Sequence, residues 1–97
     1  MQTSVTFKNL DSSQYLKTYI DEKLSRFDKL LLKPCTAEVV LSSEKLRNIV
    51  EINLTGPKLS VIAKEENTEM HAAIDLVMDK VKKQIIKNKE KIQEHRA

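Results

Sequence analysis

Three consecutive runs of alternating apolar and polar residues in the middle of the chain constrain the fold more than any other feature. They occupy residues 36–43, 48–55 and 58–64, and the pair Gly56-Pro57 separates the last two as the turn of a hairpin. Alternation with a period of two places the apolar side chains on one face of each strand. The runs therefore predict a sheet with one apolar face, which other elements must cover, and one mixed face.

Two segments with helical periodicity flank these runs. The first follows the Asp-Ser-Ser sequence of residues 11–13, whose side-chain oxygens can cap a helix, and it ends before Pro34. The second is long and opens at residues 68–69. In both segments apolar residues recur mostly at spacings of three and four, which gives each helix one apolar face. These residues are Leu16, Ile20, Leu24, Phe27 and Leu31 in the first helix and Met70, Ile74, Val77, Val81, Ile85 and Ile92 in the second.

Residues 2–7 form one more alternating run before the first helix, so the expected order is β-α-β-β-β-α. The predicted fold class is α+β, with a four-stranded mixed sheet and both helices packed on its apolar face. The first two strands are joined through a helix, and we expect them to be parallel with a right-handed crossover. The length suits a single domain, residues 1–97.

The chain carries no sign of export or of membrane insertion. No run approaches 18 consecutive apolar residues, so no segment is expected to span a bilayer. The N-terminal stretch MQTSVTFKNLDSSQ lacks the charged and then apolar layout of a secretory signal. Cys35 has no second cysteine to pair with, which agrees with a reducing compartment. These features favour a cytoplasmic protein.

The residues that could support catalysis do not form a recognisable site. His71, His95 and Cys35 are too few and too separated for a metal site, and we expect Cys35 to be a small buried apolar residue. His71 is expected to be packed or solvated at the start of the second helix. Asp75 and Asp79 lie among lysines, where salt bridges are more typical than acid–base catalysis. We therefore expect no enzyme, no cofactor, no metal and no small-molecule substrate.

The charge of the chain is concentrated at its C-terminal end. Residues 80–97 hold seven Lys or Arg and two Glu, whereas residues 1–79 hold ten Lys or Arg and twelve Asp or Glu. Helical spacing places part of this charge in one basic stripe on the second helix, about 16 Å long. The stripe consists of Lys80, Lys83, Lys87 and Lys91, while Lys82 and Lys89 fall on the other flank with Asp75, Asp79 and Glu90.

Two interpretations of these cations remain open. One interpretation is a surface that binds a polyanion such as RNA phosphates, and the other is a solvated helix end that complements the helix macrodipole. The first helix adds Lys23, Arg26 and Lys29, which would extend the same surface if the helices lie side by side. Acidic neighbours for these three cations are equally available. They are Asp21, Glu22 and Asp28.

The familiar sheet-based and loop-based RNA motifs are absent. The four aromatic residues, Phe7, Tyr15, Tyr19 and Phe27, all precede the three later strands, so those strands offer no ring on which bases could stack. Gly56 is the only glycine, which excludes a GXXG loop. Recognition of structured RNA by the helices remains compatible with the sequence.

Four stretches of the sequence resemble the ribosome hibernation-promoting factor family, which includes the ribosome-associated inhibitor and proteins described as sigma-54 modulators. They are EMHAAIDLVMDKVKKQIIKNKEK, YIDEKLSRFDKL, VVLSSEK and VEINLTGPKLSVIAKEE, and together they cover nearly the whole chain. The resemblance implies the β-α-β-β-β-α architecture, similar to double-stranded-RNA-binding domains. It also implies a short family form, without the extra C-terminal domain of the long members.

The resemblance implies a function as well. Members of this family bind the small ribosomal subunit in the channel between head and body, where they occupy the A and P sites. There they block messenger and transfer RNA and inhibit translation in starved or stationary cells. The short form promotes ribosome dimers together with a separate ribosome modulation factor. The family's basic positions fall on Lys23, Arg26, Lys45, Arg47, Lys80, Lys83 and Lys87, and the stripe adds Lys91.

The sequence departs from the family pattern at four positions, one of which is Glu69, where an aspartate is usual. His71 stands where a tyrosine is usual, and Asn48 and Asn88 stand where histidines are common. The contacts of those family side chains are therefore not carried over to this chain. A regulatory protein-interaction module is the alternative function, and it would use Val40, Ile49 and Ile62 on the mixed sheet face. A general RNA chaperone, which would bind any duplex, is a third.

Overall fold

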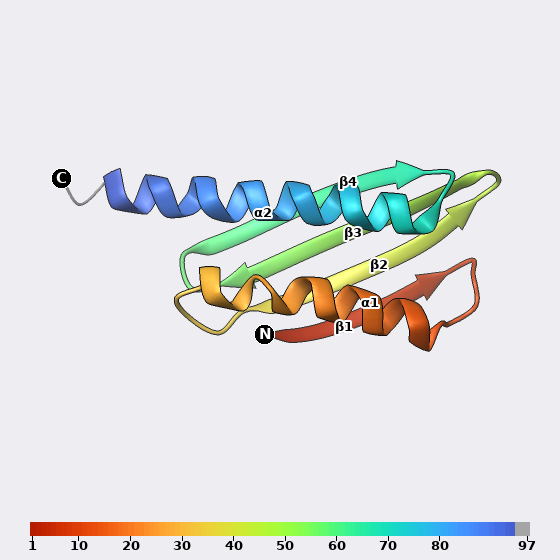
Figure 1. Ribbon diagram of the computed structural model, residues 1–97, viewed down its shortest axis with the longest axis horizontal. Coiled ribbons are helices and arrows are strands. Elements are labelled where there is room, and N and C mark those ends of the chain that lie inside the picture. The colour runs from red at the N-terminus through yellow and green to blue at the C-terminus, as the bar shows by residue number, and fades with distance from the viewer. Residues whose placement is uncertain (95–97) are drawn as a thin grey trace.

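The computed structural model describes the backbone of residues 1–94 and the side chains of residues 1–89. The order β-α-β-β-β-α is confirmed (Figure 1). A short 3-10 turn, Asp28–Leu30, follows the first helix. The strands are β1 (Gln2–Lys8), β2 (Thr36–Glu44), β3 (Arg47–Gly56) and β4 (Leu59–Asn67), and the helices are α1 (Gln14–Ser25) and α2 (Met70–Glu94).

The four strands form one mixed sheet in the order β1-β2-β3-β4. β1 runs parallel to β2, as expected for strands joined through a helix, whereas β2, β3 and β4 pair as antiparallel neighbours. Both helices lie side by side on the same face of the sheet, as Figure 1 shows. α2 packs over β3 and β4, so its outer flank lies beside the edge strand.

A single core fills the space between the sheet and the helices. The inward residues of the strands are almost completely buried, and each large aliphatic side chain removed from water contributes about 1.5–3 kcal/mol. The alternation in the sequence thus identified the buried face of the sheet. The buried strand residues are Ala37, Val39, Leu41, Val50, Ile52, Leu54, Val61 and Ala63, and the buried helix residues include Ile20, Leu24, Ile74, Val77, Val81 and Ile85.

The first helix is shorter than its apolar periodicity predicts. Ser13 caps its start, because its side-chain oxygen accepts a hydrogen bond from the amide of Leu16 at 3.2 Å. The helix ends at Ser25, well before Pro34. The amide of Phe27 bonds to the carbonyl of Leu24 at 2.9 Å, a tighter pattern than in an α-helix, and leads into the 3-10 turn. This turn still buries Phe27.

The first hairpin turn is shorter than the predicted gap between the strands, residues 44–47, and the second is one residue later than the predicted Gly56-Pro57. Arg47 belongs to β3, and the first turn consists of Lys45 and Leu46, with Lys45 at a φ of 51°. Gly56 is the last residue of β3, and the second turn consists of Pro57 and Lys58, with Lys58 at a φ of 59°. Gly56 does not have a positive φ; it is needed because a Cβ atom there would lie 2.5 Å from Sγ of Cys35.

Candidate nucleic-acid interface

One flank of α2 is bonded to the edge strand β4. Lys80, Gln84 and Asn88 follow one another at four-residue spacing and donate hydrogen bonds to main-chain carbonyls at 3.3, 3.1 and 3.3 Å. The acceptors are the carbonyls of Lys64, Ile62 and Lys58. Side chains that satisfy and cover an edge strand protect it from pairing with other chains. This flank therefore has a structural role in the fold.

Lys80 is part of this structural flank. Its ammonium group also pairs with the carboxylate of Glu65 at 2.7 Å. The first lysine of the predicted stripe therefore contacts strand β4 of the same protein and differs in this respect from the exposed lysines that follow it. Lys91 lies within α2, but its side chain is outside the described residues.

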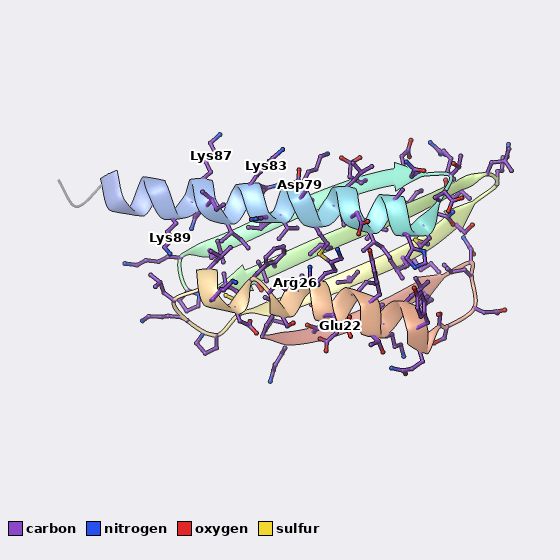
Figure 2. All side chains as sticks on the ribbon, viewed as in Figure 1. Glu22, Arg26, Asp79, Lys83, Lys87 and Lys89 are labelled. Carbon is purple, nitrogen blue, oxygen red and sulfur yellow. The ribbon has the colours of Figure 1, made fainter. Side chains whose placement is uncertain are left out.

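The exposed side of α2 presents Lys83 and Lys87, which we call the outer ridge. Figure 2 shows both projecting from the side of α2 that faces away from α1. Lys83 pairs with Asp79 at 3.0 Å, whereas no acidic partner of Lys87 occurs among the described side chains. Asp79 lies on the flank of Asp75 and Lys82, as predicted, and its carboxylate also reaches Lys83 one turn further along the exposed side of α2.

A second set of cations lines a hollow of about 440 Å³ between the two helices, which we call the inter-helix groove. Its polar lining consists of four cations and two carboxylates. One of the cations, Lys23, pairs with Asp75 at 3.6 Å, which leaves a surplus of positive charge. Cations gathered in a cleft attract phosphate groups. The polar residues are Lys23, Arg26, Lys29, Lys82, Asp75 and Asp79.

The cations of the two helices do form one surface in the inter-helix groove. The α2 residue that joins the cations of α1 there is Lys82, which is not a member of the predicted stripe. Lys82 was missed as a site residue because helical spacing places it among aspartates. The signal was nevertheless present in the sequence: two helices on one sheet face must turn one flank of α2 toward α1, and Lys82 lies on that flank.

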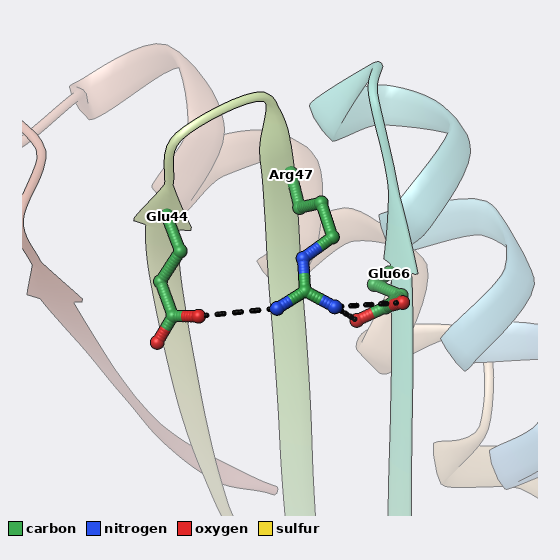
Figure 3. A network of polar contacts seen from close by, with 3 residues as sticks. All are labelled: Glu44, Arg47 and Glu66. Carbon is green, nitrogen blue, oxygen red and sulfur yellow. Dashed lines mark hydrogen bonds and ion pairs between the residues drawn. The ribbon is translucent and has the colours of Figure 1, made fainter.

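The predicted basic loop lies far from the outer ridge. Lys45 and Arg47 are at the turn between β2 and β3, whereas Lys87 lies near the opposite end of the molecule (Figures 1 and 2). Figure 3 shows Arg47 held between two carboxylates, with nitrogen–oxygen distances of 3.3 Å to Glu44 and 3.2 Å to Glu66. Lys45 is exposed at the tip of the turn and has no acidic partner among the described residues.

An aromatic cluster connects the start of α1 to the start of α2. It consists of Tyr15, Tyr19 and His71. The centroid of the His71 ring lies 5.4 Å from that of Tyr15 and 5.0 Å from that of Tyr19. The Tyr19 hydroxyl donates a hydrogen bond to Oδ1 of Asp75, and this bond, followed by burial, raises the pKa of Tyr19 to about 12. His71 is exposed to solvent but contacts both rings.

Cys35 is buried, as predicted, and its thiol contacts the carbonyl of Lys33 at 3.3 Å. Burial raises the pKa of the Cys35 thiol, which disfavours the reactive thiolate. Among the described residues, no group of three or more His, Cys, Asp or Glu side chains could hold a metal ion. In the same part of the chain, no helix is both long and apolar enough to cross a membrane.

Comparison with known proteins gives concordant results. Residues 3–93 match the family model described as "Sigma 54 modulation protein / S30EA ribosomal protein". The ribosome hibernation promoting factor of Azotobacter vinelandii is 36% identical over 91 residues, which cover 94% of this chain and 85% of that protein.

Two solved structures share the fold. The crystal structure of the N-terminal domain of Thermus thermophilus Protein Y has a TM-score of 0.83 and 29% identity, and the match covers 88% of this chain and 96% of that one. A ribosomal subunit interface protein from Coxiella burnetii has a TM-score of 0.80 and 27% identity, with 93% and 99% covered.

Proposed function

Because this chain belongs to the family of sigma 54 modulation proteins and S30EA ribosomal proteins, we propose that it silences idle ribosomes by occupying the small ribosomal subunit. It is a homologue of ribosome hibernation promoting factors, and this family consists of ribosome-binding proteins that are not enzymes. In this proposal residues 1–97 act as one ribosome-binding unit in the cytoplasm. The site is the decoding channel, where the protein excludes messenger RNA and transfer RNA from the A and P sites.

The inter-helix groove is the observation that carries this proposal. Three of its four cations are exposed, and the fourth, Lys23, is partly buried and already paired with one of the two carboxylates. The closely spaced phosphates of ribosomal RNA are attracted to such a positively charged groove, and this attraction depends little on base sequence. Arg26, Lys29 and Lys82 are then the first phosphate contacts, and Lys23 borders them.

The outer ridge supplies a second set of phosphate contacts in the proposal. Lys83 and Lys87 are exposed on the same helical layer as the groove, although they project from the far side of α2. Lys45 adds a contact at the distant hairpin tip. Arg47 and Lys80 contribute less, since each must first release a carboxylate of the protein itself.

The opposite face of the molecule supports this orientation. The outward strand residues carry three cations and four carboxylates, so this face would repel phosphates slightly or be neutral toward them. We therefore place the RNA on the helical layer and leave the sheet face away from it. The outward charged residues are Lys8, Arg47, Lys64, Glu38, Glu44, Glu51 and Glu66.

The alternative is a protein-interaction module that uses the sheet face. Ile62 is 62% exposed there, whereas Val40 and Ile49 are partly buried. One exposed isoleucine is little apolar area for a docking surface, so the described residues favour the RNA-binding function. Promotion of ribosome dimers with a separate ribosome modulation factor is part of the proposal through the family resemblance alone.

Co-sedimentation with purified small subunits tests the proposal. We expect binding that messenger RNA and initiator transfer RNA together abolish, because all three ligands occupy the same channel. Binding that is indifferent to these ligands would place the protein elsewhere, and absence of binding would favour the interaction module. An excess of unrelated duplex RNA that displaces the protein from subunits would indicate a general chaperone.

Charge reversal identifies the surface used. The double variant Lys83→Glu, Lys87→Glu is expected to lose subunit binding at physiological salt while it keeps its fold, because both side chains are exposed. The matched control is Lys8→Glu with Lys64→Glu, which makes the same charge change on the sheet face. Equal loss of binding in both variants would mean that net charge, and not the helical layer, determines binding.

A further inference from the structure

The aromatic cluster of Tyr15, Tyr19 and His71 has an exposed part that the fold does not use. Tyr15 is 65% exposed, although tyrosine is among the larger side chains that folding normally covers. Its ring and that of Tyr19 are nearly parallel, with an interplanar angle of 19° and centroids 6.5 Å apart. The chain therefore presents aromatic surface to solvent beside its cationic groove.

Contacts around the cluster hold the rings in place. The Nε2 atom of His71 lies 3.2 Å from the hydroxyl oxygen of Tyr15, within hydrogen-bonding distance. Tyr19 is fixed by its hydrogen bond to Asp75 and by the ammonium group of Lys23, which lies 5.3 Å from its ring centroid. Rings that are already oriented lose little conformational freedom when a flat ligand stacks on them.

The cluster is continuous with the cations of α1. Tyr15, Tyr19 and Lys23 follow one another at four-residue spacing, and the C-cap residue Arg26 comes three residues later. Residues at these spacings share one side of a helix, and eleven residues span about 16 Å. One side of α1 is thus aromatic in its first half and cationic in its second.

This is the combination found where proteins bind unpaired nucleic acid, with aromatic rings for the bases and cations for the backbone. We propose that Tyr15, Tyr19 and His71 form a stacking platform for an unpaired base of RNA whose phosphates lie along the inter-helix groove. The proposal rests on the ribosomal-RNA binding proposed above and adds a base contact to it.

The charge around the platform is compatible with this ligand. Asp75 is the carboxylate nearest to Tyr19, and it would repel a phosphate if it were free. It is engaged instead by the Tyr19 hydroxyl and, at 3.6 Å, by the ammonium group of Lys23. A base paired within a duplex has no free face to offer, so the platform should select bulges, loops or strand ends.

Tyrosine fluorescence provides a direct test, because the chain has two tyrosines and no tryptophan, and both tyrosines are in the platform. The probes are one RNA hairpin with a bulge of unpaired adenines and the same hairpin fully paired. We expect the bulged hairpin to quench the fluorescence and bind more tightly. Equal quenching and equal affinity for the two hairpins would overturn the platform.

Variants at Tyr15 separate stacking from folding. Tyr15→Leu should weaken binding of the bulged hairpin by roughly 5- to 150-fold, the range for loss of one stacked base, and leave the paired hairpin unaffected. Tyr15→Phe keeps the ring but loses the hydroxyl contact with His71, so it should retain most of the affinity that Tyr15→Leu loses. Circular dichroism checks that both variants are folded. A Tyr15→Leu variant that binds the bulged hairpin normally would overturn the inference.

The same variants with small subunits distinguish the two proposals. If the parent protein binds subunits and Tyr15→Leu binds them less tightly, both proposals are supported. If both proteins bind equally well, the platform is overturned and the ribosomal function stands. If the parent protein does not bind subunits, the proposed function fails, whatever the hairpins show.

Discussion

The hydroxyl of Tyr19 donates a hydrogen bond to Oδ1 of Asp75 over 2.5 Å and so joins α1 to α2 across 56 positions of sequence. Lys23 binds the same carboxylate from the next turn of α1. This three-residue bridge sits at one boundary of the inter-helix groove and fixes how the cations of the two helices face each other. The aromatic cluster and the groove are therefore parts of one arrangement.

The bridge predicts the titration of Tyr19. In a Tyr15→Phe background Tyr19 is the only phenol, and its pKa should be about 12. Asp75→Asn should lower it toward the ordinary value of 10.0, because the anionic acceptor that favours the neutral phenol is removed. Tyrosinate absorbance as a function of pH measures both values. An unchanged pKa in the Asp75→Asn variant would show that the bond does not control Tyr19.

The same shift has a consequence for stability. A phenol whose pKa is raised by folding stabilises the folded state fully below pH 10, and this contribution is lost as the pH rises toward 12. The effect should be modest because Tyr19 is partly exposed. The melting temperature should therefore fall less between pH 10 and pH 12 in the Asp75→Asn variant than in the parent protein.

Asp79 is predicted to restrain RNA binding. Its carboxylate pairs with Lys83 at 3.0 Å on an exposed surface and also lines the groove. Asp79→Asn should raise the affinity for small subunits by roughly 1.5- to 5-fold, since exposed pairs are worth about 0.2–1 kcal/mol. In a Lys83→Met background the gain should shrink. A gain of the same size in that background would assign the effect to the groove and not to Lys83.

The sequence was sufficient to predict the sheet and its buried face, for a local reason. Residues such as Val50, Ile52 and Leu54 alternate with outward residues, and this period is a property of each strand by itself. The end of α1 was not predictable in the same way. The apolar spacing continues through Phe27, but the chain reaches that buried position through a 3-10 turn that only the packed structure defines.

The exposure of the α2 lysines was predictable, but their contacts were not. Helical spacing places Lys83 and Lys87 away from the apolar face, and both are exposed, whereas the partners of individual cations depend on strand register and helix placement. Arg47 meets Glu66 because β3 and β4 pair Asn48 with Asn67. Lys80 meets Glu65 because α2 lies over β4, and the sequence spacing gives no sign of either pair.

Lys80 and Lys87 should differ in what they do. Lys80→Met removes a bond to the carbonyl of Lys64 and an ion pair with Glu65, and should lower the free energy of unfolding by about 0.5–1.5 kcal/mol. Lys87→Met should leave stability unchanged and weaken subunit binding more than Lys80→Met does. Denaturant titrations and subunit binding, measured on the same two variants, compare the effects. The reverse order would restore Lys80 to the RNA-binding surface.

At the hairpin tip, Lys45 should contribute a phosphate contact and Arg47 should not. Lys45→Gly is compatible with the φ of 51° and removes one positive charge. It should therefore reduce the slope of log affinity against log salt by about 1, the value for one phosphate contact. Arg47→Gln should leave that dependence nearly unchanged, because Arg47 is already bound by Glu44 and Glu66. The slope of log affinity against log salt decides this. Equal slopes for Lys45→Gly and the parent protein would remove the hairpin from the interface.

The close approach of Cys35 should make glycine necessary at position 56, at the end of β3. Gly56→Ala would place a Cβ atom 2.5 Å from Sγ of a buried cysteine, and the displacement needed should cost about 1–3 kcal/mol in the free energy of unfolding. In a Cys35→Ala background the nearest remaining atoms lie 3.4 Å away, an ordinary contact, so the cost should largely disappear. Denaturant titrations of the four proteins give the coupling energy. An equal cost in both backgrounds would mean that the backbone of Gly56, and not the sulfur atom, requires glycine.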